Sequence, residues 1–432
     1  MGTKQIISKN ISADSTQYIG KDGELWVDTV TNKMKISDGT TPGGVDIVGL
    51  GGGGGATTWA ALGDKNNANG PLTVALGINA GLTNQGLTAT AIGAAAGSTD
   101  QDTGAVAVGY QAGFNSQGVD AVAVGKSAGR TNQGESSVAV GDSAGDTTQG
   151  DFSIAVGLTA GQTNQGQNSI AIGFESAYTG QGTTATAVGN SAGKTNQGED
   201  ATAIGAGAGV TNQGTSAVAI GVGAGVTTQG DRAVAVGNLA GQTTQGIETV
   251  ALGNKAGETT QAQYGIAIGT QAGQDTQSEK SVAIGPYAGM TTQGSQAVAI
   301  GHNSGKTTQA ADTVAIGVQA GQTTQSEKSV AIGPFAGQIT QGDRAVAIGH
   351  NSGKTAQGTK AIAIGTNAGT TNQAANSIIL NATGLTVENV QPDSFVVQPV
   401  RNYSNAAALP TGFKQVAYNP TTGEFVYYGS AG

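Results

Sequence analysis

The sequence contains no cysteine, and it is poor in the residues that catalysis and metal binding use most. Without thiols there can be no disulfide, no thiolate nucleophile and no thiolate-bound metal. His302 and His350 are the only histidines in 432 residues, so we expect no catalytic residue, no metal and no cofactor. No acid–base pair recurs at a fixed spacing either, and we therefore expect that the protein is not an enzyme.

Charge and long apolar runs are also scarce. Charged residues make up 11% of the chain and the net charge is −9, which offers no basic surface for nucleic acid. No apolar run approaches the roughly 18 residues of a membrane span, so we expect no membrane insertion. The start, MGTKQIISKNISADS, lacks the charged and apolar regions of a secretory signal. The 74 glycines follow no Gly-X-Y period, which excludes collagen.

What the sequence has in abundance is a repeat of sixteen residues. Every sixteenth residue from Gly77 to Gly365 is glycine, and an aliphatic residue precedes each one. A glutamine series with the same period runs from Gln85 to Gln373. A short period without insertions is typical of a solenoid, in which each repeat forms one coil stacked on the last. We therefore predict an all-β chain, a parallel β-solenoid of sixteen-residue coils.

Residues 282–297, VAIGPYAGMTTQGSQA, represent one coil. Val282 and Ile284 alternate with Ala283, which is the pattern of a short strand. We expect the large aliphatic side chains to be buried and alanine to lie on the opposite face. On this interpretation Ile284→Asp buries an unpaired charge and disrupts stacking, whereas the same change at Met290, in a variable turn, is tolerated.

Two further positions of the coil have a structural interpretation. Gly285 ends the strand at a turn that a Cβ atom would obstruct. The second strand contributes Gln293, one of the glutamines that recur in every coil. Identical amides one strand apart can hydrogen-bond along their column, so we expect a buried ladder rather than a row of ligand-binding groups.

Positions that accept every chemical type form the turns, and the charged residues gather there. Residues 278–325 and 326–373 are near copies offset by 48 residues, with SEKSVAIGPYAG repeated as SEKSVAIGPFAG and GHNSGKT as itself. GHNSGKT is one residue too short for a phosphate loop. The TTQ rows leave ice binding as a competing surface function, which a thermal-hysteresis assay would detect.

The strand motif, SVAIG at 281–285 and AVAIG at 297–301, resembles the head repeats of trimeric autotransporter adhesins. Those heads are trimers of left-handed parallel β-rolls, so the resemblance implies a homotrimer of the same architecture. The period of sixteen residues is longer than the usual adhesin unit.

The two ends of the chain resemble a second class of proteins. Residues 18–44, with GELWVD and ISDGTTP, look like the N-terminal module of tailed-phage fibres. Residues 393–424 resemble the closing segment of repeat-containing viral fibres. The resemblance implies a fibre on the surface of a virion, held by a virion structural protein and extending a tip to a glycan or protein of the host surface. The alternatives are a bacterial trimeric surface adhesin and a structural virion appendage that binds no receptor.

Composition divides the chain into four segments. Gly51 to Gly55 is an unbroken pentaglycine, typical of a flexible linker, and a change to aromatic-rich sequence marks the C-terminal segment. The expected segments are an N-terminal virion-attachment module (1–50), a linker and cap (51–72), the solenoid shaft (73–383) and a β-rich tip (384–432).

The aromatic residues of the tip have two interpretations. Strand-like runs at 395–400, 414–418 and 424–428 predict a small β-structure with an aromatic core. Aromatic side chains are also enriched at interfaces, so some of them are candidates for receptor contact. The candidates are Tyr403, Tyr418, Tyr427 and Tyr428.

Overall fold

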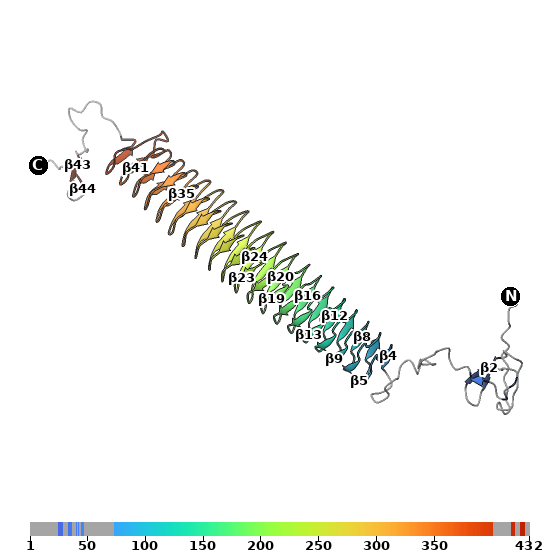
Figure 1. Ribbon diagram of the computed structural model, residues 1–432. Coiled ribbons are helices and arrows are strands. Elements are labelled where there is room, and N and C mark those ends of the chain that lie inside the picture. The colour runs from blue at the N-terminus through green and yellow to red at the C-terminus, as the bar shows by residue number, and fades with distance from the viewer. Residues whose placement is uncertain are drawn as a thin grey trace, which may run out of the picture. The chain divides into compact units, whose positions relative to one another are not determined.

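The computed structural model describes residues 25–28, 33–36, 40, 42, 45–46, 73–400, 416–419 and 424–427. All regular elements in these ranges are β-strands, with no helix among them. The chain divides into two compact units, Met1–Ile172 and Gly173–Gly432, and within each the coils stack as a parallel β-solenoid (Figure 1). The predicted fold class is confirmed. The linker and cap expected at 51–72 lie outside the described residues.

Each coil contributes one strand to a sheet that we call the aliphatic sheet. Its strands pair in parallel with a shift of one coil, as Val122 with Val138 and Val282 with Val298. In the first unit they are β4 (Val74–Leu76), β6 (Thr90–Ile92), β8 (Val106–Val108), β10 (Val122–Val124), β12 (Val138–Val140), β14 (Ile154–Val156) and β16 (Ile170–Ile172). In the second unit they are β18 (Thr186–Val188), β20 (Thr202–Ile204), β22 (Val218–Ile220), β24 (Val234–Val236), β26 (Val250–Leu252), β28 (Ile266–Ile268), β30 (Val282–Ile284), β32 (Val298–Ile300), β34 (Val314–Ile316), β36 (Val330–Ile332), β38 (Val346–Ile348), β40 (Ile362–Ile364), β41 (Ile378–Asn381) and β42 (Phe395–Gln398).

The second strand of each coil belongs to a sheet that we call the glutamine sheet, which is also parallel. In the first unit its strands are β5 (Thr83–Gln85), β7 (Thr99–Gln101), β9 (Asn115–Gln117), β11 (Thr131–Gln133), β13 (Thr147–Gln149) and β15 (Thr163–Gln165). In the second unit they are β17 (Thr179–Gln181), β19 (Thr195–Gln197), β21 (Thr211–Gln213), β23 (Thr228–Gln229), β25 (Thr244–Gln245), β27 (Thr260–Gln261), β29 (Thr276–Gln277), β31 (Thr292–Gln293), β33 (Thr308–Gln309), β35 (Thr324–Gln325), β37 (Thr340–Gln341) and β39 (Ala356–Gln357).

The expected inside and outside of the coil are reversed in the structure. Ala283 is completely buried, whereas Val282 and Ile284 are only partly buried and lie on the outer face of the strand. The same pattern recurs in other coils, where Ile204 and Leu252 are 40% and 43% exposed. The space between the two sheets is narrow: it holds alanine methyl groups from one side and extended glutamine side chains from the other. Ile284→Asp therefore does not bury a charge within the coil, and our expectation was wrong.

The glycine that ends each aliphatic strand is required by its backbone and by the next coil. Gly285 has φ +119, a region that residues with a Cβ rarely adopt. A Cβ placed on it would lie 2.9 Å from the carbonyl carbon of Gly301, in the backbone of the next coil. The predicted steric role of this glycine is confirmed.

The backbone of the glutamine sheet takes two forms, and the residue before the glutamine decides between them. Where this residue is Asn, Asp, Ser or Gly it is left-handed, as at Asn132 (φ 53) and Asn212 (φ 52). In the coils with Thr-Thr-Gln it is not left-handed, and the strand shortens to Thr–Gln, as in β31. Thr148 (φ 56) is an exception that lies between coils of the first form. Asn and Asp tolerate this region better than β-branched residues do, so the switch follows from the sequence.

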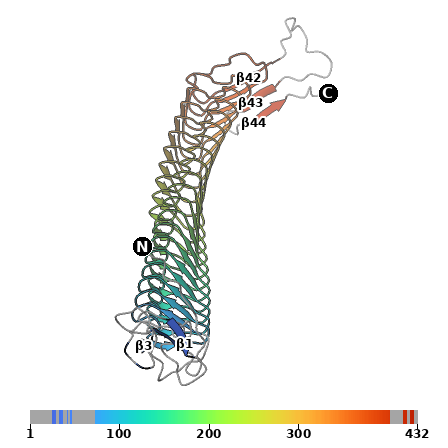
Figure 2. The ribbon, with the colours of Figure 1, turned by 90° about the vertical axis from the view of Figure 1, so that its right-hand side faces the viewer.

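Short strands flank the solenoid. β1 (Leu25–Asp28), β2 (Lys33–Ile36) and β3 (Val45–Asp46) form a three-stranded antiparallel sheet in the first unit. In the second unit, Ile379 replaces the core alanine and packs with Ala368 and Val387, which closes the alanine core with larger side chains. β43 (Val416–Asn419) and β44 (Glu424–Tyr427) form a hairpin that Figure 2 shows beside β42, and the rings of Phe395 and Phe425 are 6.0 Å apart.

Candidate functional site

The buried glutamines are the first group to consider, because a row of amides could bind a ligand. Gln293 Nε2 donates to the carbonyl oxygens of Val282 (2.7 Å) and Ala297 (3.2 Å) and to Oε1 of Gln309 (3.2 Å). The amide thus ties the two sheets of a coil together and connects one coil to the next. The expected ladder is confirmed. The hydrogen bond between successive amides is missing at some coils, where the Oε1 atoms of Gln133, Gln149 and Gln213 are buried without a hydrogen-bond partner.

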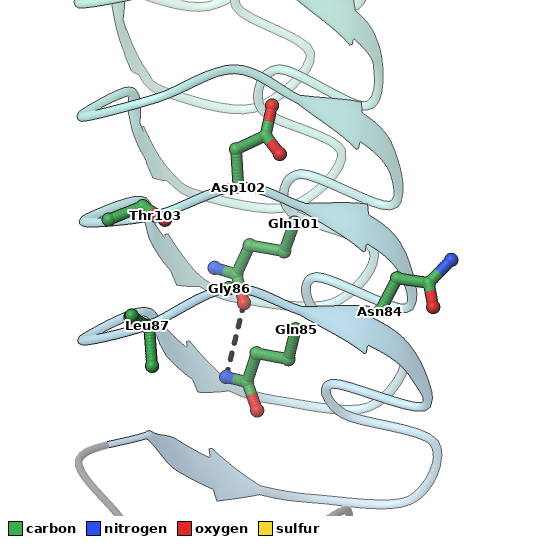
Figure 3. A pocket seen from close by; sticks show the side chains of 7 residues that line it. All are labelled: Asn84, Gln85, Gly86, Leu87, Gln101, Asp102 and Thr103. Carbon is green, nitrogen blue, oxygen red and sulfur yellow. Dashed lines mark hydrogen bonds between the residues drawn. The ribbon is translucent and has the colours of Figure 1, made fainter. Parts of the chain in front are cut away.

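A hollow of about 280 Å³ lies between the first coils (Figure 3). The amides of Gln85 and Gln101 bond to each other there at 3.2 Å, and Asn84 donates to Asp100. Of the residues that line the hollow, only Asp102 carries a titratable side chain. One carboxylate without a second acid, base or nucleophile gives no basis for acid–base or nucleophilic chemistry at this place. The lining residues are Asn84, Gln85, Gly86, Leu87, Gln101, Asp102 and Thr103.

The two histidines lie in equivalent turns and each contacts an aromatic ring of the preceding coil. His302 stands edge-on to Tyr287 with ring centroids 6.0 Å apart, and His350 is placed in the same way against Phe335 at 5.8 Å. Within the part of the chain that the structure describes, no three His, Asp or Glu side chains come close enough together to hold a metal ion. In the same part, no helix is long and apolar enough to cross a bilayer.

Many turn charges pair from one coil to the next, which makes them part of the scaffold. Lys126 lies 3.4 Å from Asp142, and Arg232 lies 2.7 Å from Glu248. Arg130 pairs with Asp146 at 2.7 Å, and burial raises the pKa of the Asp146 carboxyl, partly opposed by the Arg130 charge. Exposed pairs of this kind stabilise a fold only weakly.

The outer face of the aliphatic sheet exposes a row of apolar side chains. The side chains on both sides of each buried alanine form a mostly apolar row, interrupted by Thr90, Thr186 and Thr202, which we call the aliphatic stripe. In the first unit it includes Ile92 (38% exposed) and Val124 (37%), and in the second Ile348 (36%) and Ile364 (39%). Monomeric proteins rarely expose a continuous apolar row of this kind, so the stripe is a candidate contact surface.

The structure brings two of the four candidate tyrosines together. Tyr418 lies in β43 and Tyr427 in β44, where they pair with Phe425 and Val416 respectively. Tyr403 and Tyr428 lie outside the described residues, and receptor contact by any of the four tyrosines remains a prediction. Sequence reasoning missed the aliphatic stripe because alternation of large and small residues does not say which face is inside.

Comparison with known proteins gives one match. Residues 213–240 and 341–368 match the YadA head domain repeat. This is the head repeat of trimeric autotransporter adhesins, so these two segments of the solenoid are similar to repeats of adhesin-like surface proteins. The match names no phage protein. No curated protein and no solved structure matches the chain.

Proposed function

We propose that the chain is a homotrimeric surface fibre that mediates attachment, with the solenoid as its shaft. The observation that carries the proposal is the aliphatic stripe, which leaves one face of most coils apolar. Removing such a face from water is favourable by roughly 25 cal/mol per Å² of apolar area buried. Identical chains are the natural partner, because a copy in register presents the same stripe at every level.

Three chains are favoured over two by the match to the adhesin head repeat. A threefold arrangement also suits the geometry, since three flat sheets facing one axis enclose their aliphatic side chains. The glutamine sheet then lies on the outside of the assembly. Its exposed threonines, such as Thr292 and Thr308, fit that location.

A bacterial surface is the setting that the match to the adhesin repeat supports best. The second candidate is a virion, supported by the resemblance of residues 18–44 to phage-fibre modules and by the small sheet β1–β3, whose strands β1 and β2 lie in that segment. In both settings we assign residues 1–50 to attachment of the fibre, 51–72 to a linker and cap, 73–383 to the shaft and 384–432 to the tip.

We assign receptor contact to the tip and a non-catalytic role to the whole chain. Tyr403, Tyr418, Tyr427 and Tyr428 are the proposed contacts, and three copies of a weak site would raise the avidity for a host surface. Adhesin head repeats bind rather than catalyse. Incubation with host polysaccharide should therefore produce no new reducing ends, and their appearance would move the chain to another class.

The attachment proposal is tested by binding of the purified chain to whole host cells. We expect binding by the wild type and loss of binding when Tyr418 and Tyr427 are replaced by serine, with the number of chains per particle unchanged. Labels near residues 1 and 432, followed by electron microscopy, distinguish the two settings. A label near residue 1 on a virion supports the phage setting, and one on the cell envelope supports the bacterial setting.

A further inference from the structure

Two equivalent turns of the second unit carry nearly the same cluster of side chains. Tyr287, His302 and Lys306 form the first copy, and the second copy follows after 48 residues. In both copies the aromatic residue comes from one coil, and the histidine and the lysine come from the next. We call these groups the aromatic–lysine clusters. The second consists of Phe335, His350 and Lys354.

The two clusters have nearly the same geometry. The His302 ring is perpendicular to Tyr287, with 82° between the planes, and Lys306 Nζ lies 5.3 Å from the centre of the Tyr287 ring. The second cluster has 85° between its ring planes and a distance of 5.4 Å from Lys354 Nζ to the Phe335 ring. An ammonium over an aromatic face is held in place while its remaining donors stay available.

The aromatic residues occupy an unfavourable backbone position. Tyr287 and Phe335 both have φ 59, in the left-handed region that bulky side chains rarely adopt. The neighbouring coils place Gln271 and Gln319 at the same position. Neither ring contributes to the alanine core, so packing within the coil does not explain why an aromatic residue stands there. The left-handed conformation recurs at this position in other coils, as at Gln271 and Asn303, so it is the aromatic side chain and not the backbone that sets the clusters apart.

Carboxylates in the turns that precede the aliphatic strands of these coils are paired locally. Glu279, Glu327 and Asp343 each pair with the lysine or arginine that follows them. Lys306 and Lys354 form no ion pair with any residue that the structure describes, so their charges are not neutralised. In a chain with a net charge of −9, this edge therefore presents two uncompensated cations beside two aromatic rings.

The clusters lie at a surface that remains accessible. Pro286 and His302 are exposed, and Tyr287 and Lys306 are partly exposed. Pro286 and His302 occupy the turn position that holds the ion pair of Lys126 and Asp142 in other coils. Because a packed apolar interface would exclude such charges, this edge is distinct from the aliphatic stripe.

We propose that each aromatic–lysine cluster binds a sugar that bears a carboxylate. The ammonium of Lys306 or Lys354 pairs with the carboxylate, and the adjacent ring packs against the apolar face of the sugar. The two clusters are three coils apart, or about 14 Å along the stack at roughly 4.8 Å per strand. One acidic polysaccharide chain can therefore occupy both, and the second contact raises the avidity of the first.

The test is calorimetric titration of the full chain with oligosialic acid, with neutral dextran and dextran sulfate as comparisons. The first variant combines Lys306→Gln and Lys354→Gln, because Gln322 and Gln338 show that these turns accept glutamine. The second combines Tyr287→Gln and Phe335→Gln. The matched control combines Tyr264→Gln and Lys280→Gln: this tyrosine has φ 58 and its lysine lies 6.0 Å from the ring, but Glu279 neutralises that lysine at 2.8 Å.

We expect the wild type and the control to bind oligosialic acid equally. Each cluster variant should bind at least about tenfold more weakly, as expected for the loss of a charge-assisted contact. Neutral dextran should not bind. Absence of binding by the wild type, equal binding by cluster and control variants, or binding of dextran sulfate alone would each overturn the proposal. Unchanged unfolding temperatures of the variants would separate a loss of binding from a loss of fold.

Discussion

The amide nitrogen of Gln293 donates to the carbonyl oxygen of Val282, 2.7 Å away across the narrow interior of one coil. The two residues belong to different sheets, so this bond fixes the distance between them. The same contact joins Gln309 to Val298 and Gln341 to Val330. It accounts for a glutamine in every coil: a shorter amide would not reach, and an apolar residue would leave carbonyl groups unsatisfied.

Replacing this glutamine should destabilise the solenoid. Gln293→Leu keeps the volume but leaves the carbonyls of Val282 and Ala297 without this donor, which costs about 1–3 kcal/mol. Chemical denaturation of the variant and the wild type measures the difference. The control is Gln296→Ser, at an exposed turn position that holds serine in other coils, such as Ser216. Equal stability of the two variants would mean that the ladder is not structural.

The glycine that ends each aliphatic strand should not accept a side chain. In Gly285→Ala the new Cβ would meet the backbone of Gly301, at a φ that alanine rarely adopts, and we expect a loss of at least about 1 kcal/mol. Gly342→Ala is the control: a Cβ there would also approach the next coil, 2.6 Å from the carbonyl carbon of Gly358, but the φ of Gly342 is not positive and Ala310 occupies the same position in another coil. Thermal unfolding of both variants tests the difference, and an equally small effect at both sites would contradict it.

Thr148 offers a stabilising substitution. It is exposed and left-handed (φ 56), whereas the neighbouring coils have Asn132 and Asn164 at this position. Thr148→Asn should raise stability by about 1 kcal/mol, because asparagine tolerates this conformation better. The same change at Thr292, which is not left-handed, should give no gain. The midpoints of denaturant unfolding decide between these outcomes.

The raised pKa of Asp146 gives a pH dependence. Burial favours the protonated carboxyl in the folded state, so this residue's contribution to stability falls as pH rises above the ordinary aspartate pKa of about 3.9. Asp146→Asn should remove that decline and be at least as stable as the wild type at pH 7. Unfolding temperatures measured at a series of pH values test this, with the exposed Asp312→Asn as control. An unfolding temperature that rises with pH more in the wild type than in Asp146→Asn would contradict this prediction.

The sequence predicts the path of the chain more fully than the direction of its side chains. The strand at Val282–Ile284 follows from β-branched residues that favour strands, and the turn at Gly285 follows from a glycine that can adopt a φ other residues rarely reach. The burial of Ala283 does not follow, because alternation defines two faces equally well and only the separation of the sheets selects the inner one. The repeated glutamine could have indicated the inner face, because a long amide buried between two close sheets leaves space only for a small side chain such as alanine opposite it.

The candidate binding residues also fall into a group that the sequence predicts and a group that it does not. The hairpin that contains Tyr418 and Tyr427 could be predicted from alternating residues around a turn. The aromatic–lysine clusters could not, because Tyr287 and Lys306 are 19 positions apart and meet only when successive coils stack. The repetition after 48 residues could be seen in the sequence, but the contact between the lysine and the aromatic ring could not.

Native mass spectrometry tests the central claim, a trimer held by the aliphatic stripe, most directly. The wild type should give three chains per particle. A variant with lysine at Ile284, Ile300 and Ile316 should dissociate, since it places three levels of like charge in the stripe. The control, with lysine at Thr292, Thr308 and Thr324 of the glutamine sheet, should remain trimeric. A monomeric wild type, or a stripe variant that stays trimeric, would contradict the account.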